Sequence, residues 1–229
     1  FMTVLAVFEL LLAHAAGQDR IAVGTNVANR RRFETLELIG LFVNQLVLAT
    51  DLGGDPTFRE LLGRVREVAL SAYAHQDLPF EKLVEELQPE RDLGRPLLFQ
   101  VKVEVQSATP PLPDLAGLTL TPLEIDRGVV RYDLHLSLTE TGGGLAGWLQ
   151  YSTDLFDPPA ADRIARDFER LLERVLADPD ARLSALTADL AASAREAELE
   201  RLGERKKANV ESLTRTRRRT VAGDDRQSL

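Results

Sequence analysis

Residues 99–106 read FQVKVEVQ, in which apolar and polar side chains alternate without a break. Side chains two positions apart lie on the same face of a β-strand, so this pattern predicts a strand with one buried face and one polar face. The alternation returns in RYDLHLSL, residues 131–138, and the turn sequence TGGG at 141–144 leads into a further strand over 145–151. The centre of the chain therefore predicts a β-sheet.

Outward from this centre, strands and helices are expected to intermix. Residues 21–24 and the second half of 39–50 are apolar and are interpreted as buried strands, and a further strand is expected over 118–125. Four segments instead carry apolar residues three and four positions apart, which is typical of amphipathic helices: 1–16, 56–72, 80–87 and 158–175. This order predicts an α+β fold, a mixed β-sheet with packed helices.

Two prolines help to place the helix starts. Asp55 and Asp157 each precede a proline, and we expect each aspartate to cap the helix that follows. No capping residue precedes the segment 1–16, so we expect the chain to begin inside a helix of a larger domain. Its apolar stripe is expected to pack on the sheet.

The domain organisation follows from the change in composition near the C-terminus. Residues 1–187 carry the strand and helix patterns and are expected to form one lobe. Residues 188–229 are expected to be a linker, with an exposed helix over 191–205 and a polar, disordered end at 223–229.

Composition narrows the classes of function. The 229 residues carry a net charge of −8, which argues against nucleic acid and anionic membrane as partners. There is no cysteine, and none of the three histidines has another at helical spacing, so we expect no disulfide and no metal site. There is also no Gly-rich phosphate loop, and we expect no directly bound cofactor. No signal peptide or membrane span is evident, which favours a cytoplasmic location.

Five short strings resemble the core motifs of condensation domains from nonribosomal peptide synthetases, and they occur in the family's order. The strings are VGTNVANR at 23–30, IGLFVNQLVL at 39–48, HQDLPFE at 75–81, RDLGRPLLFQV at 91–101 and YSTDLFD at 151–157. Together they resemble the C-terminal lobe of such a domain. The resemblance implies a fold like that of chloramphenicol acetyltransferase.

The resemblance also implies a reaction and its partners. In the family, two peptidyl carrier proteins present acyl groups as thioesters on phosphopantetheine, and the amine of one attacks the thioester of the other to form an amide. The histidine motif HHxxxDG of that family lies in the N-terminal lobe and does not occur in this chain. The chain is therefore expected to be inactive alone and to need the missing N-terminal lobe or adjacent synthetase domains. Ala49 and Gln45 also depart from the usual arginine and threonine of the fifth motif.

Three functions remain open from the sequence. The chain can be part of a catalytic condensation domain, or a condensation-like docking module that binds a carrier protein or a tailoring enzyme such as a hydroxylase. The third, an independent acetyltransferase of the chloramphenicol type, is disfavoured because the histidine motif is absent.

Candidate site residues come from the motif matches. Asn44 is expected either to line the substrate tunnel or to bond backbone at a strand start. Gln100 is expected to line the tunnel or to face solvent. The run Arg30, Arg31 and Arg32 is a candidate docking site for a carrier protein, with a solvated loop as the alternative.

The remaining motif positions are expected to be structural. They are Gly40, Phe42, His75, Asp77, Pro79, Phe80, Arg91, Phe99, Asp154 and Phe156. His75 is expected to bond backbone near a helix start, and Asp77 to cap that helix. His135 is interpreted as part of a surface charge set with Arg131 and Asp133, and Trp148 as a core residue.

Overall fold

The structure is a computed structural model that describes residues 1–87, 98–107, 117–118, 121, 123 and 128–190. Residues 1–186 form one compact unit and residues 187–229 a second. The fold belongs to the first unit. Within the described part of the chain, no helix is both long and apolar enough to cross a membrane.

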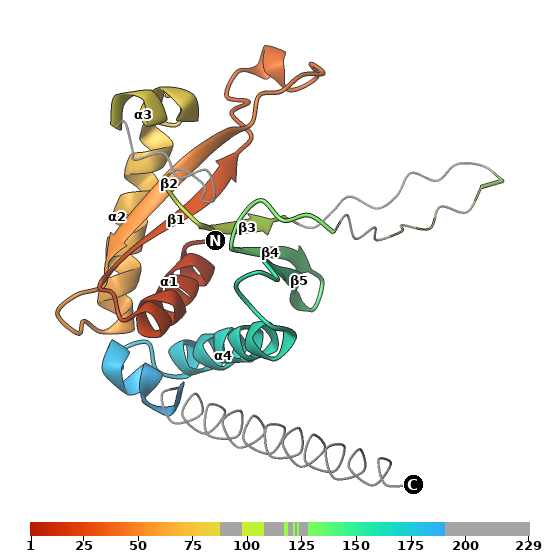
Figure 1. Cartoon of the computed structure of the whole chain (residues 1–229). Coiled ribbons are helices and arrows are strands. Elements are labelled where there is room, and N and C mark those ends of the chain that lie inside the picture. Colours follow the sequence, from red (N-terminus) through yellow and green to blue (C-terminus); the bar gives the residue numbers. More distant parts are fainter. Residues whose placement is uncertain (88–97, 108–116, 119–120, 122, 124–127, 191–229) are drawn as a thin grey trace, which may run out of the picture. The chain divides into compact units, whose positions relative to one another are not determined.

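A five-stranded mixed sheet forms the centre of the lobe, as the alternating patterns predict (Figure 1). Its strands are β1 (Arg20–Val27), β2 (Asn44–Asp51), β3 (Val101–Gln106), β4 (Leu134–Thr141) and β5 (Gly144–Tyr151). The spatial order is β2-β1-β3-β4-β5, in which the two outer pairs are antiparallel and the two inner pairs parallel. The predicted Gly-rich turn joins β4 to β5.

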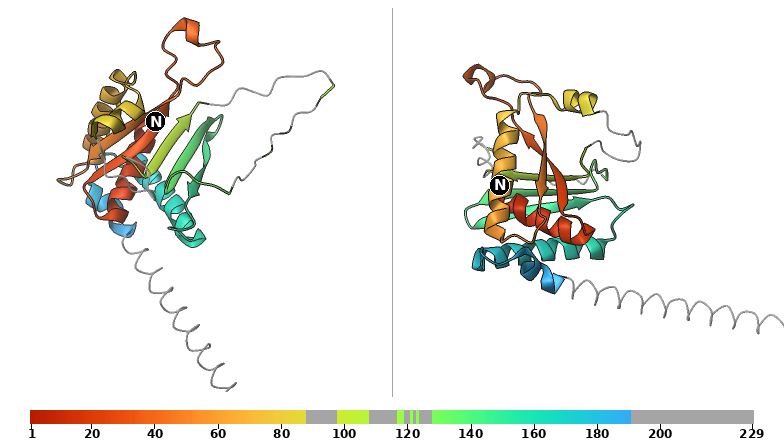
Figure 2. Two further views of the ribbon diagram at one scale, coloured as in Figure 1. Left: turned by 45° about the horizontal axis from the view of Figure 1, so that its top comes forward. Right: turned by 90° about the vertical axis from the view of Figure 1, so that its left-hand side faces the viewer.

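Helices pack on the sheet face that carries the apolar residues. They are α1 (Met2–Ala16), α2 (Phe58–Ala74) and α4 (Pro158–Ala177), whereas α3 (Phe80–Leu87) contacts β2 and has no buried residue, and a short 3₁₀ helix, η1, spans Phe33–Thr35. Helix α1 contacts β1, α2 and α4, so it lies in the middle of the core (Figure 2). Every residue from Val4 to Leu11 is buried. The sequence predicted one apolar stripe along this helix, but the structure shows the helix buried on all sides over two turns.

The helix starts agree with the sequence in one case and correct it in the other. Asp157 caps α4, because its carboxylate accepts the backbone N–H three residues on at 2.9 Å. Helix α2 is capped instead by Thr57, which forms a reciprocal capping box with Glu60. The carboxylate of Asp55 accepts the backbone N–H and the hydroxyl of Ser184. The expectation that Asp55 is the cap was wrong because the Thr-x-x-Glu box satisfies the first N–H groups of the helix two residues later.

Several expectations concern residues outside the described ranges. Arg91, most of the strand expected over 118–125, the helix expected over 191–205 and the polar end at 223–229 all lie there. The division into a lobe at 1–187 and a linker at 188–229 stays a prediction.

Candidate functional site

The face of the sheet opposite the helices is polar at its centre. In β3 and β4 the register pairs Lys102 with His135 and Glu104 with Ser137. Side chains of paired residues lie on the same face, and they alternate with apolar positions such as Val103, which is buried against the helices. The parallel pairing therefore brings charged residues that are 31 to 33 positions apart in the chain to one place.

Glu104 is the centre of this polar cluster. Its Oε1 accepts the amide N–H of Asn26 at 2.7 Å and lies 2.9 Å from Lys102 Nζ, and its Oε2 lies 3.0 Å from His135 Nε2. The hydrogen bond from His135, followed by that from Lys102, lowers the pKa of Glu104 to about 2 against the opposing effect of burial. Glu104 is therefore an ionised, fully engaged carboxylate at neutral pH.

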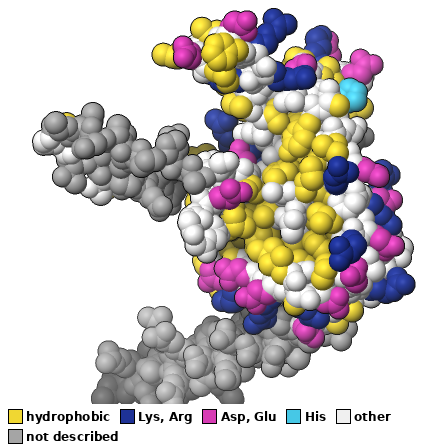
Figure 3. All heavy atoms as spheres, turned by 180° about the vertical axis from the view of Figure 1, so that it is seen from behind, with side chains coloured by type: hydrophobic (Ala, Val, Ile, Leu, Met, Phe, Trp, Pro, Cys, Tyr) yellow, Lys and Arg dark blue, Asp and Glu magenta, His cyan; other side chains and the backbone are white. Residues whose placement is uncertain are grey.

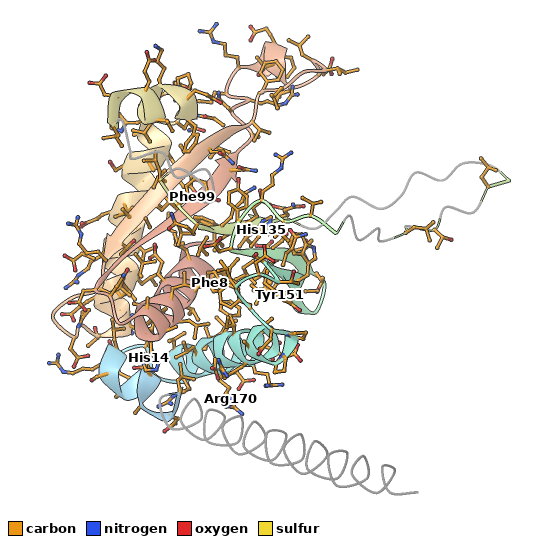
Figure 4. All side chains as sticks on the ribbon, in the orientation of Figure 1. Phe8, His14, Phe99, His135, Tyr151 and Arg170 are labelled. Carbon is orange, nitrogen blue, oxygen red and sulfur yellow. The ribbon has the colours of Figure 1, made fainter. Side chains whose placement is uncertain are left out.

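Five rings form a row of neighbouring contacts that includes Phe99 and His135, both labelled in Figure 4. The ring centroids of Phe80 and Phe99 are 5.8 Å apart, those of Phe99 and Tyr132 5.5 Å, those of Tyr132 and His135 6.1 Å, and those of His135 and Trp148 4.9 Å. Edge-to-face and offset-stacked rings at these separations attract one another. The row fixes the orientation of the His135 imidazole.

These observations change two of the sequence interpretations. His135 was expected to be a surface residue grouped with Arg131 and Asp133, but its side chain is only 13% exposed and bonds to Glu104 of the neighbouring strand. Trp148 was expected in the core, but it is 50% exposed on the edge strand β5. Both interpretations failed because they treated each strand without its partners.

An open groove of about 830 Å³ lies over this face. Its lining combines amide, charged, aromatic and aliphatic side chains. The lining residues are Asn26, Leu41, Val43, Asn44, Gln45, Phe80, Glu81, Lys102, Val129, Arg131, Tyr132, His135 and Gln150. Gln45, which departs from the family motif, donates its amide N–H to the Tyr132 hydroxyl at 2.7 Å. This hydrogen bond links two residues that line the groove.

Asn44 lies at the groove but its side chain is engaged by backbone. Its Nδ2 donates to the carbonyls of Gln76 and Leu78 at 2.9 and 2.7 Å, and its Oδ1 accepts the N–H of Phe80 at 3.0 Å. Phe80 is the first residue of α3, so Asn44, and not the expected Asp77, accepts this N–H at the helix start. The Asn44 side chain therefore connects the start of β2 to the start of α3 by hydrogen bonds.

The other motif residues of this region form hydrogen bonds with nearby backbone groups. His75 ends α2 and its Nδ1 lies 2.8 Å from the Ser71 carbonyl, so it bonds backbone at a helix end. The Pro79 carbonyl accepts N–H groups of the first turn of α3. Gln100 is exposed just before β3, and its carbonyl accepts the N–H of Asp133 at 2.9 Å.

Asp154 and Phe156 occupy the turn after β5. Asp154 is exposed, whereas Phe156 is half-buried and its N–H donates to the Ser152 carbonyl at 2.9 Å. They form part of the connection to α4, and neither lines the groove.

The three candidate docking arginines lie at the base of a loop, residues 28–43, which we call the arm. The Arg30 guanidinium donates to the carbonyl of Thr35 and stacks 4.3 Å from the centroid of the Phe42 ring. Arg30 also reaches the Gly40 carbonyl at 3.5 Å. The guanidinium therefore ties the two ends of the loop together and is not simply a solvated charge.

Arg31 and Arg32 differ from Arg30. Arg31 forms an exposed ion pair with Asp77 at 2.8 Å, and Arg32 is exposed. The arm also carries six large apolar side chains that are at least half exposed. They are Phe33, Leu36, Leu38, Ile39, Leu41 and Val43. Hydrophobic side chains are visible on the projecting part of the molecule at the upper left of Figure 3.

The groove residues Asn26, Lys102 and Tyr132, and Glu104 beside them, were not candidates from the sequence. The signal was present in the polar positions of the alternating strands, but choosing among them requires the parallel pairing of β3 and β4. No group of three or more His, Asp and Glu side chains within the described ranges has the arrangement of a metal site.

Comparisons with known proteins place this geometry in a family. The model of the family described as "Condensation domain" matches residues 1–199. One of the subunits of the linear gramicidin synthase of Brevibacillus parabrevis is 50% identical over 182 residues, which are 79% of this chain and 4% of that protein. The chain therefore spans only a small part of the curated relatives that it matches.

Solved structures agree with the family match. The X-domain in a complex with OxyB from teicoplanin biosynthesis is 34% identical with a TM-score of 0.71, over 81% of this chain and 41% of that one. The four-domain nonribosomal peptide synthetase AB3403 is 25% identical with a TM-score of 0.73, over 80% of this chain and 15% of that one. With a family model matching most of its length, the chain belongs to the condensation-domain family of nonribosomal peptide synthetases.

Proposed function

We propose that the chain forms one side of the substrate passage of a condensation domain and takes part in joining two carrier-bound acyl groups through an amide bond. The observation that carries the proposal is the groove over the polar face of the sheet. It combines polar and charged side chains, among them Gln150 and Arg131, with aromatic rings that can contact apolar side chains of a substrate.

The arm supports a role within a larger assembly. Six exposed apolar side chains within eleven residues form a surface that a protein normally covers. Because Arg30 holds the loop in shape, this surface exists before a partner binds. We propose that the N-terminal lobe of the domain covers it.

The catalytic histidines belong to that partner lobe. The string HHxxxDG does not occur in the 229 residues, so the chain should contribute to the reaction only when it is paired. The substrates would arrive on the phosphopantetheine arms of peptidyl carrier proteins, which are the expected partners, and no cofactor would bind to the lobe directly.

A second candidate function is docking without catalysis. The observation in its favour is the similarity to an X-domain whose solved structure is a complex with OxyB. In this version the lobe would present a surface to a carrier protein or to a tailoring enzyme such as a hydroxylase.

A complementation experiment separates the two candidates. The chain would be mixed with an N-terminal lobe carrying HHxxxDG from a close relative, together with donor and acceptor carrier proteins, and dipeptide product followed by mass spectrometry. We expect product from the mixture and none from either lobe alone. The relative's own two lobes, expressed separately, are the positive control. If that control is active and the mixture is not, the docking function is favoured, and product from the chain alone would contradict both.

A further inference from the structure

Strand β5 forms an open edge of the sheet. Among the described strands it pairs with β4 alone, and its eight residues match those of β4 one to one without a bulge. In an edge strand, alternate N–H and C=O groups point away from the neighbouring strand and can bond an added strand. The first five residues of β5 are exposed. The edge is therefore long, regular and accessible.

The residues of β5 lack the features that usually protect a sheet edge. Charged side chains, proline and bulges normally keep edges from pairing with other chains. The sequence of β5, GLAGWLQY, contains no charge and no proline. The other outer strand, β2, ends in Asp51, and helices α2 and α3 contact it. Trp148 and Leu145 of β5 are 50% and 44% exposed, so the unprotected edge also carries apolar surface.

The chemistry of this edge selects the strand that fits it. Main-chain pairing requires an extended segment without a bulge. A charged side chain set against this uncharged strand would lose hydration without gaining an ion-pair partner. Strand β5 itself meets both conditions, because it is extended, regular and uncharged over the same length. The β5 of a second copy therefore complements the edge, and a two-fold axis closes the contact.

The two-fold axis also determines which residues meet. An axis perpendicular to the sheet pairs the strands antiparallel and keeps each face on its own side, so residues of the same face oppose one another. With the axis at Trp148, this residue meets its own copy and Leu145 meets Tyr151. The Trp148 ring already packs on His135, with centroids 4.9 Å apart, so its position is fixed before pairing. Tryptophan is among the side chains that most often anchor an interface.

We propose that β5 is a self-association site, at which two copies of this chain pair antiparallel about Trp148. Five strands from each copy then form one continuous ten-stranded sheet. Both grooves open on the same side of it, because the axis keeps the two faces apart. Eight residues a side are fewer than the roughly 20–30 of a standard interface, so the dimer is weak and depends on concentration. The contact uses no residue of the arm and is independent of the pairing with an N-terminal lobe.

Analytical ultracentrifugation of the whole chain over a range of concentrations tests the association. We expect the original chain to shift from monomer to dimer as its concentration rises. Trp148→Lys sets two ammonium groups against each other and should raise the dissociation constant at least tenfold. Ala146→Lys, on the same face of β5, should do the same with Trp148 in place. Leu176→Lys, at an exposed leucine of α4, is the matched control and should dimerise as the original chain does. Circular dichroism checks that each variant is folded.

Cysteine cross-linking tests the register, because the chain has no cysteine of its own. Leu145→Cys combined with Tyr151→Cys keeps Trp148 and places each thiol opposite one of the other copy, so mild oxidation should give a disulfide-linked dimer. Neither substitution alone should do so, since each residue lies six positions from its own copy along the pair, about 20 Å away.

Three results would each overturn the proposal. They are a monomer at every concentration, dimerisation of Trp148→Lys and Ala146→Lys equal to that of the original chain, and a double cysteine variant that cross-links no better than the single ones. Dimerisation that survives both lysine substitutions would place the contact elsewhere on the lobe.

Discussion

At the scale of single residues, Gly24 makes the aromatic row possible. Gly24 lies on β1, and a Cβ built on it would be 2.0 Å from Cε2 of Phe99, which is far inside van der Waals contact. The ring of Phe99 therefore occupies the space that any other residue at position 24 would need. Through Phe99 this glycine also sets the position of Tyr132 in the groove wall.

We predict that Gly24→Ala destabilises the lobe by about 1–3 kcal/mol, as overpacking of a core does. The methyl group must displace the Phe99 ring, which is buried and cannot move outward freely. Urea unfolding followed by circular dichroism measures the change. Gly63→Ala is the matched control: it lies inside α2 with no atom within 4 Å of the new Cβ, so it should leave stability unchanged or raise it. Equal effects of the two substitutions would contradict the prediction.

Glu9 is a second residue whose environment has measurable consequences. It lies on α1, is fully buried, and accepts a hydrogen bond from the Thr50 hydroxyl at 3.0 Å through Oε1. Its Oε2 has no partner among the described residues. Burial raises the pKa of Glu9 to about 8, and the bond from Thr50 only partly opposes this. Glu9 is therefore protonated in the folded lobe at neutral pH.

We predict that the lobe loses stability as pH rises from about 4.5 to about 8. The unfolded chain ionises Glu9 near its ordinary pKa, whereas the folded chain keeps the proton until about 8, so each pH unit in this window costs about 1.4 kcal/mol. Glu9→Gln should remove this slope. Chemical unfolding at a series of pH values measures it, with the exposed Glu67→Gln as control. A flat profile in the original chain would show that Glu9 is solvated.

At the scale of elements, the arm is a loop whose order depends on one side chain. Arg30 bonds the Thr35 carbonyl within the first half of the loop and stacks on Phe42 in the second half. A guanidinium can do both because its donors lie in a plane whose face remains free for a ring. The arm has no other cation placed in this way among the described residues.

We predict that Arg30→Ala loosens the arm without unfolding the lobe. Amide hydrogen exchange of residues 33–42 should accelerate several-fold, because the bonds that close the loop are lost, while exchange in β1 and β2 stays unchanged. Arg32→Ala is the matched control, since that side chain is exposed and makes no ion pair in the described structure. Equal acceleration in both variants would mean that Arg30 does not order the loop.

Much of the secondary structure follows from local patterns, for physical reasons. The alternation at 99–106 and 131–138 and the helical spacing at 158–175 reflect a buried face, which forces the sequence to repeat with the period of the element. The helix at 1–16 was also predicted, but not its burial all round, because that depends on α2 and α4 covering its remaining sides.

The candidate site was much less predictable. Asn44 was found through a motif, and both of its possible roles were open until the backbone of α3 was placed against it. The cluster around Glu104 depends on the register between β3 and β4. A shift of one residue in this register would place the side chains of one strand on the other face of the sheet. That register is set by the packing of the whole lobe, so no local pattern reveals it.

At the scale of the whole molecule, the exposed apolar residues of the arm should govern assembly with the N-terminal lobe. We predict that Ile39→Ser combined with Leu41→Ser weakens the pairing of the two lobes at least tenfold, because both side chains are almost fully exposed in the isolated chain and would be buried in the pair. Isothermal titration calorimetry with the relative's N-terminal lobe measures it. Leu176→Ser, an exposed leucine on α4, is the control and should have little effect.

Docking of a carrier protein is the second property that we expect of the whole assembly. The region around the phosphopantetheine of a carrier protein is expected to be acidic, and Arg31 and Arg32 are the exposed cations beside the groove-lining arm. Such an encounter is steered by charge, so it weakens with salt as the Debye length falls from about 10 Å at 0.1 M to about 3 Å at 1 M. Arg30 is excluded from the test because its loss would disturb the arm itself.

We predict that Arg31→Ala combined with Arg32→Ala lowers the affinity for the carrier protein several-fold at 0.1 M salt and leaves it nearly unchanged at 1 M. Arg31 must leave its ion pair with Asp77 to reach the carrier, and an exposed pair of this kind costs at most about 1 kcal/mol to break. Asp77→Asn should therefore strengthen docking slightly, which a general loss of structure would not do. Chemical-shift mapping on the carrier protein follows all three proteins at both salt concentrations. An affinity that does not respond to salt, or that falls in Asp77→Asn as it does in the double variant, would place the docking surface elsewhere on the lobe.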